Sequence, residues 1–95
     1  MIYVEIREDR IRVIGHAGFA PKGFSLPCAA VSALTLTLLC GLSDVAHMDT
    51  EGSVVRDGYV SIVWKAMQPI GKALIDTWKI GMDAIREEYQ CITFV

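Results

Sequence analysis

The sequence predicts an α+β fold for a single domain over residues 1–95, with two helices packed on one face of an antiparallel-rich sheet in two layers. Short stretches of alternating apolar and polar residues predict strands. Two long segments patterned at the helical period predict helices. Their order along the chain is β-β-α-β-β-α with a possible last strand, which is typical of an α+β layer fold. Ninety-five residues allow one domain at most.

Two hairpins account for most of the predicted strands. Residues 2–7 and 10–15 each alternate apolar with polar side chains, so they predict the two strands of an N-terminal hairpin. The run 53–64, SVVRDGYVSIVW, predicts a second hairpin around Asp57-Gly58, a pair typical of a type I′ turn. The tail CITFV is a candidate fifth strand.

The two predicted helices have recognisable start and stop signals. Ser25 is a suitable N-cap for the first helix, Pro27 fits its first turn, and Gly41 lies where it should stop, near residue 42. A polar connection follows at 43–52, and Pro69 opens a second helix that runs to about residue 89. The apolar stripe predicted for this second helix consists of Ile70, Leu74, Trp78, Met82, Ile85 and Tyr89.

The first helix is apolar around nearly its whole circumference, and such a helix needs to be buried on all sides. One sheet covers only one side, so we expect a homodimer formed through the helices. The hydrophobic content of 53% points the same way, because a short chain cannot bury so much apolar surface alone. The uncharged run between Lys22 and Asp44 is interrupted and lacks anchoring residues, and the charged N-terminus does not resemble a signal peptide. We therefore expect a cytoplasmic protein with no membrane partner.

Composition argues against several classes of function. Three cysteines without CxxC spacing favour neither a disulfide framework nor a zinc site, so we expect no metal and no cofactor. The formal net charge is −2 and the nine basic residues are scattered, so we expect no nucleic-acid partner.

One cysteine lies where its thiol would be reactive. Counted from the Ser25 cap, Cys28 falls in the first helical turn, where unpaired N–H groups and the helix dipole favour a thiolate. His16 precedes it on the glycine-rich loop 15–24 and could reach the sulfur as a general base. The alternative is that Cys28 is a small packing residue, since cysteine is often buried. We expect Cys40 to lie in the core, Cys91 to be packing and His47 to be solvated.

These residues also resemble a known family. The motif GHA at Gly15–Ala17, a glycine at 23, CAAVSAL at Cys28–Leu34 and the late GMDAIREEYQCITF are similar to the bacterial ribosomal-processing cysteine protease family, Prp or YsxB-like. The resemblance extends over the whole chain, including both hairpins.

The resemblance implies a homodimeric cysteine endopeptidase that removes a short N-terminal extension from a large-subunit ribosomal protein, cutting after aromatic residues. It implies Cys28 as nucleophile and His16 as base, with N–H groups near Ala29 and Ala30 holding the oxyanion. Residues 17–24 correspond to a flap over the peptide substrate. The candidate flap and substrate-binding residues are Gly15, Ala17, Gly18, Phe19, Gly23 and Ser25.

The chain departs from the family pattern at two positions. Ser25 stands where the pattern has Asp, and Pro27 stands where it has an aliphatic residue. Serine can cap the helix but supplies no charge to an imidazolium, and proline removes one N–H. Three possibilities therefore remain: an active protease, a weakened or inactive homodimeric binding module, and a structural protein in which Cys28 is buried.

Overall fold

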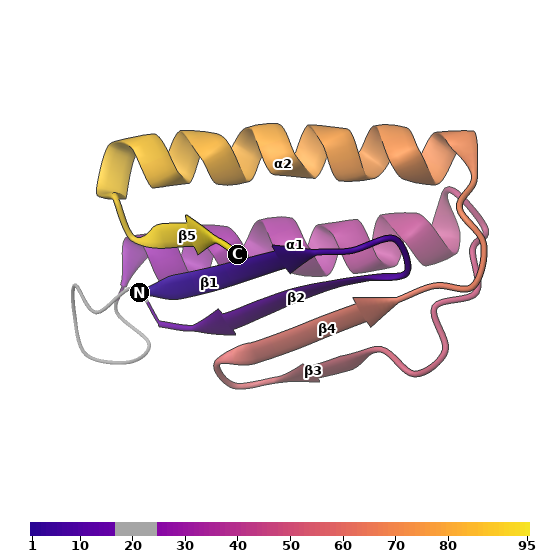
Figure 1. Cartoon of the computed structure of the whole chain (residues 1–95), viewed down its shortest axis with the longest axis horizontal. Helices are drawn as coiled ribbons and strands as arrows, with labels where there is room; N and C mark the ends of the chain where they lie inside the picture. The colour runs from indigo at the N-terminus through magenta and orange to yellow at the C-terminus, as the bar shows by residue number, and fades with distance from the viewer. Residues whose placement is uncertain (17–24) are drawn as a thin grey trace.

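The computed structural model describes residues 1–16 and 25–95 and has a five-stranded sheet with both helices on one of its faces (Figure 1). The predicted α+β class is confirmed. In chain order the elements are β1 (Ile2–Ile6), β2 (Arg10–Gly15), α1 (Leu26–Asp44), β3 (Val54–Arg56), β4 (Tyr59–Val63), α2 (Pro69–Tyr89) and β5 (Ile92–Phe94).

The strand order β3-β4-β2-β1-β5 brings the two hairpins together in the middle of the sheet. Neighbouring strands are antiparallel except for β1 and β5, which are parallel. In the β2–β4 pair, Ile14 lies opposite Tyr59. This register places the C-terminal end of β2 beside the turn that joins β3 to β4.

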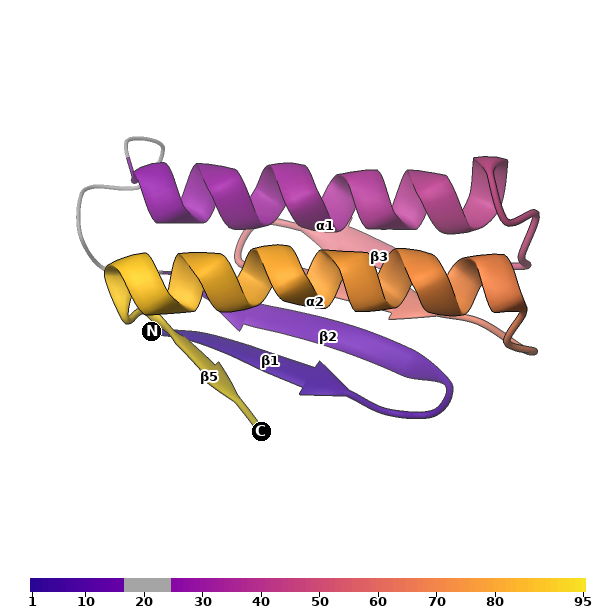
Figure 2. The same ribbon diagram turned by 90° about the horizontal axis from the view of Figure 1, so that it is seen from above.

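The core lies between the sheet and the helices, which run side by side across it (Figure 2). Strand residues such as Val4 and Ile62 and helix residues such as Leu42 are completely buried there. The two helices are also joined by a buried hydrogen bond, in which the Trp78 indole N–H donates to the Thr35 hydroxyl at 3.3 Å.

Helix α1 differs from the prediction at its C-terminal end. It continues to Asp44, and Gly41 lies inside it rather than at its end. An ideal Cβ on Gly41 would be 3.4 Å from Leu74 Cδ1, so this glycine lies at the contact between the helices. The prediction that Cys40 lies in the core is wrong. Cys40 is exposed because it is on the side of α1 turned away from the sheet.

The predicted stripe of α2 is correct in its middle and wrong at its N-terminal end. Trp78 and Met82 are buried, whereas Ile70 is 54% exposed. Ile75, which the predicted stripe left out, is buried instead. Ile70 lies on a different face of α2 from its buried residues, which are Gly71, Ile75, Trp78 and Met82, so its apolar character did not indicate burial.

The hairpin around Asp57-Gly58 is present, but its turn is not type I′. Type I′ requires positive φ at both central residues. Gly58 has a φ of 70°, whereas Asp57 is not among the residues with positive φ. Positive φ at the second residue alone is the pattern of a type II turn, which also favours glycine there.

By length and composition alone, α1 could cross a membrane. The core helix of a soluble protein passes the same test, and α1 contributes Val31, Leu38 and Leu42 to the core of this fold.

Candidate active site

Cys28 lies in the first turn of α1, where the sequence placed it. Ser25 is the N-cap, and its side-chain oxygen accepts a hydrogen bond from the Cys28 backbone N–H at 3.3 Å. Pro27 occupies the first turn, where a missing N–H leaves no helical bond unmade. The half-buried Cys28 therefore lies at the positive end of the helix dipole.

His16 directly follows β2 and is held through its backbone on two sides. Its carbonyl oxygen accepts a hydrogen bond from the amino group of Met1 at 2.6 Å. The preceding residue, Gly15, donates its N–H to the carbonyl oxygen of Gly58 at 2.9 Å. The histidine thus leaves a strand end that is tied both to the start of β1 and to the β3–β4 turn.

The ring of His16 lies against Gly58. An ideal Cβ built on Gly58 would be only 2.8 Å from His16 Nε2 and 3.5 Å from both Cδ2 and Cε1. Sequence reasoning identified Gly58 only as a turn residue. Nothing local in the sequence connects it to His16, because their proximity arises from the pairing of β2 with β4.

One cavity of about 510 Å³ is lined by both His16 and Cys28. Its walls are the first half of α1, the ends of β1 and β2, and residues 55–60 of the β3–β4 hairpin. The structure therefore brings the two predicted reactive groups to the same space, between a helix N-terminus and a hairpin. Of the predicted flap residues, Gly15 and Ser25 also line this cavity, while Ala17, Gly18, Phe19 and Gly23 lie outside the described residues.

The oxyanion donors expected from the sequence have other partners. The Ala29 N–H donates to the Ser25 carbonyl at 3.0 Å. Ala30 lies one residue further into α1, where helix geometry directs its N–H to the Leu26 carbonyl. Both N–H groups are therefore used by the helix itself in this structure, and the oxyanion role of Ala29 and Ala30 stays a prediction. The N–H closest to the sulfur along the chain is that of Cys28.

The other cysteines and His47 differ from Cys28 and His16 in their surroundings. Cys91 is 2% exposed, and burial raises the pKa of its thiol, so it is a packing residue as predicted. Cys40 is exposed on the outer side of α1, and His47 is exposed in the α1–β3 connection. Within residues 1–16 and 25–95, no group of three or more His, Cys, Asp or Glu side chains could hold a metal ion.

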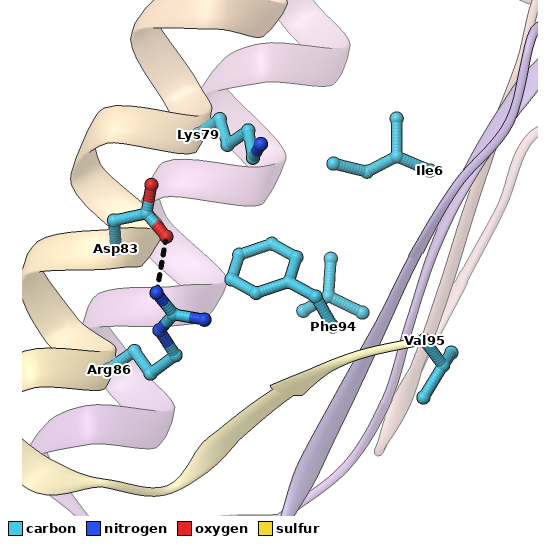
Figure 3. A pocket seen from close by; sticks show the side chains of 7 residues that line it. Ile6, Lys79, Asp83, Arg86, Phe94 and Val95 are labelled. Atoms are coloured by element: carbon cyan, nitrogen blue, oxygen red, sulfur yellow. Dashed lines mark ion pairs between the residues drawn. The ribbon is translucent and has the colours of Figure 1, made fainter.

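A second hollow, of about 370 Å³, lies between α2 and the β5 edge of the sheet (Figure 3). There the cations of Lys79 and Arg86 lie 5.8 and 5.1 Å from the centroid of the Phe94 ring, and Arg86 pairs with Asp83 at 3.4 Å. Its described lining contains neither cysteine nor histidine, so it lacks the nucleophile and the base that line the first cavity.

The family model described as cysteine protease Prp matches residues 1–92. The fold is similar to that of the ribosomal processing protease Prp from S. aureus with a covalently linked product peptide, at a TM-score of 0.80 and 19% identity over 99% of this chain and 97% of that one. The same protease with a substrate peptide gives a TM-score of 0.74 and 15% identity over 99% and 95% of the two chains.

A protein from Streptococcus mutans is similar as well, with a TM-score of 0.72 and 23% identity over 98% of this chain and 89% of that one. Among curated proteins, none matches this chain. The likeness to the solved structures establishes the fold, over nearly the whole of each chain.

Proposed function

Since the chain belongs to the family of the cysteine protease Prp, whose model covers residues 1–92, we propose that it hydrolyses peptide bonds with Cys28 as nucleophile and His16 as base. The observation that carries this proposal is the single cavity lined by both residues, with the thiol in the first turn of α1. The solved S. aureus relatives hold a product peptide and a substrate peptide, which supports a peptide as the ligand.

The proposed mechanism uses the two groups in turn. His16 takes the proton of the Cys28 thiol, and the thiolate attacks the scissile carbonyl carbon. The imidazolium then protonates the leaving amine, and the C–N bond breaks to give a thioester and the C-terminal product. Water, activated by the neutral imidazole, hydrolyses the thioester and restores the thiol.

For the oxyanion we propose the backbone N–H of Cys28 itself. A nucleophile's own N–H is a common oxyanion donor in acyl transfer. This N–H bonds to the Ser25 side-chain oxygen at the long distance of 3.3 Å. Rotation of the Ser25 side chain about its Cα–Cβ bond would move Oγ away and release the donor to the substrate, while the cap forms again once product leaves.

The proposed substrate is the N-terminal extension of a large-subunit ribosomal protein in the cytoplasm, cut after an aromatic residue. Support comes from the family and from the cavity, whose lining beside Cys28 includes the apolar side chains of Val31, Leu36 and Val55. A pocket of about 510 Å³ with apolar walls is within the range of sites that bind small organic groups, so an aromatic side chain fits its size and chemistry.

The test is cleavage of a synthetic peptide that copies the extended N-terminus of that ribosomal protein, followed by mass spectrometry. Cleavage should be lost in Cys28→Ala and should fall in His16→Ala to a low residual rate that is measured at high enzyme concentration. Cys40→Ala is the matched control, because this exposed cysteine lies in the same helix, outside the cavity lining. Cleavage that survives in Cys28→Ala would remove this cysteine as the nucleophile.

A second candidate, a binding module without turnover, is favoured by one observation. Ser25 caps the helix and carries no charge, so it does not supply the carboxylate that the family pattern has at this position. This candidate predicts that the peptide binds, as measured by fluorescence anisotropy, and that Cys28→Ala binds it equally well with no product formed by either protein.

A homodimer is proposed from the outer surface of the helix layer. Leu26 is 72% exposed and Ile80 is 71% exposed, although both are large and apolar. Each helix carries one exposed line of apolar or small residues spaced alternately by three and four, the spacing of a helix-packing seam. These residues are Leu26, Ala29, Ala33, Leu36 and Cys40 on α1, and Ile70, Ala73, Thr77, Ile80 and Ala84 on α2.

Light scattering tests the dimer. The wild-type protein should give twice the chain mass of 10.5 kDa. Ala33→Glu places a charge in the middle of the α1 seam and should give the single-chain mass with an unchanged circular dichroism spectrum. Gln68→Glu adds the same charge at an exposed position before α2 and should remain dimeric. A monomeric wild type would contradict the proposal.

A further inference from the structure

We propose that Gly58, in the turn between β3 and β4, is a positioning residue for His16, and that no larger residue can replace it without displacing the base. The contact and the backbone ties are observed independently of any activity. The consequence for peptide cleavage rests on the proposed function of His16.

The first observation is steric. The His16 imidazole lies so close to the Gly58 Cα that a Cβ there would be 2.8 Å from Nε2. Real Cβ atoms are essentially never found at such a distance, so a side chain at residue 58 requires a shift, and the imidazole, at the far end of its side chain, is the group displaced at lowest cost. Nε2 is one of the two atoms of the ring that can accept or donate the catalytic proton.

The second observation is the backbone connection between the same two segments. The Gly15 N–H donates to the Gly58 carbonyl at 2.9 Å, directly before His16. The register that pairs Ile14 with Tyr59 brings this bond about. Gly58 therefore fixes the base in two ways, through its carbonyl to the preceding residue and through its bare Cα to the ring.

The third observation is that the hairpin in contact with His16 is also a wall of the candidate active site. Residues 55–60 of the hairpin also line the cavity that contains Cys28. A peptide that fills the cavity would therefore press on the same hairpin that holds the base. Occupancy of the cavity and orientation of His16 are coupled through one short turn, whose bare glycine allows the close approach.

The chain offers a matched control for the test. Gly58 has a φ of 70° and Gly52 has a φ of 93°, so alanine is strained at either position. Gly52 precedes β3, and its added Cβ would be 3.4 Å from Val63 Cγ2, away from His16. Both Gly→Ala variants should lower the melting temperature, but only the Gly58→Ala protein should change the environment of His16.

The first measurement is a double-mutant cycle on cleavage of the ribosomal-protein peptide. Gly58→Ala should lower kcat about tenfold to a hundredfold, the loss expected when a catalytic group is displaced by about 1 Å. Gly52→Ala should keep kcat within about twofold of the wild type. In a His16→Ala background the residual rate should be the same with glycine or alanine at position 58, because the ring that the Cβ strikes is gone. Equal losses from Gly58→Ala with and without His16 would overturn the proposal.

The second measurement needs no cleavage, so it separates failure of this inference from failure of the proposed function. The ring protons of His16 are followed by NMR and assigned by their loss in His16→Ala. They should shift in Gly58→Ala and stay within line width in Gly52→Ala. Unshifted His16 signals in a folded Gly58→Ala protein would refute the positioning role. If instead these signals shift and no protein cleaves the peptide, the positioning role stands and the protease proposal fails.

Discussion

The buried hydrogen bond between the helices gives a sharp test of what holds the Cys28 helix in place. In Thr35→Val the hydroxyl that accepts from the Trp78 indole N–H is replaced by a methyl group of nearly the same shape. Thr35 is 0% exposed and Trp78 is 4% exposed, so the indole N–H that loses this acceptor is buried. Threonine and valine have similar helix propensities, so the change isolates the lost acceptor.

The magnitude follows from the orphaned donor. A buried N–H left without a partner costs about 1–3 kcal/mol. The bond is long at 3.3 Å, and the new methyl group gains some apolar burial, so we expect a loss of about 1–2 kcal/mol in the free energy of unfolding. For a domain of this size, each kcal/mol corresponds to roughly 4–8 °C in melting temperature.

The assay is urea unfolding followed by tryptophan fluorescence, supported by calorimetry. Thr37→Val is the control on the same helix, because the Thr37 hydroxyl is exposed and donates to the Ala33 carbonyl, so its removal orphans no buried donor. The control should change stability by less than about 0.5 kcal/mol. A Thr35→Val protein as stable as the wild type would refute the argument that this bond anchors α1 to α2.

Three further predictions concern a glycine, a carboxylate and a thiol. Gly41→Ala should stabilise the protein by about 0.5–1 kcal/mol in urea unfolding, because alanine is the better helix residue and its Cβ would make a tolerable contact; a loss would show that the contact with Leu74 leaves no room for a Cβ. The hydrogen bond from Arg12 lowers the pKa of the Glu5 carboxyl, so its stabilisation is present near neutral pH and lost as pH falls through that lowered value. Glu5→Gln should therefore lose less stability than the wild type between pH 5 and about pH 2, and parallel curves would contradict this. Burial raises the pKa of the Cys91 thiol, so iodoacetamide at pH 8 should label this residue only after denaturation, and mass spectrometry that finds it labelled in the native protein would contradict its burial.

The parts of the fold that depend on residues close together in the sequence could be predicted from the sequence. The N-cap at Ser25, the proline-led start of α2 and both hairpins follow from local rules that the structure obeys. The position of Cys28 in the first turn follows from the cap by counting. These signals are strong because each depends on the conformation of a few consecutive residues.

What the sequence could not predict depends on tertiary contacts. An apolar ring around α1 does not say which half faces the sheet, so Cys40 was misplaced in the core. Glycine near the end of an apolar run predicts the end of a helix, but Gly41 lies inside α1 where the helix contacts Leu74 of α2. The contact between Gly58 and His16 arises from strand register, which single-sequence patterns do not determine.

The parallel pairing of β1 with β5 has a consequence for synthesis of the protein. The Ile2 N–H donates to the Cys91 carbonyl at 2.7 Å, and the Val95 N–H donates to the Val4 carbonyl at 2.9 Å. Because β1 and β5 lie at opposite ends of the sequence, β1 is synthesised long before β5, its parallel neighbour. Ile2 of β1 also lines the cavity that contains Cys28. During synthesis β1 therefore has no partner on its β5 side until residues 92–94 have left the ribosome. The cavity around the Cys28 thiol is completed only after that pairing forms.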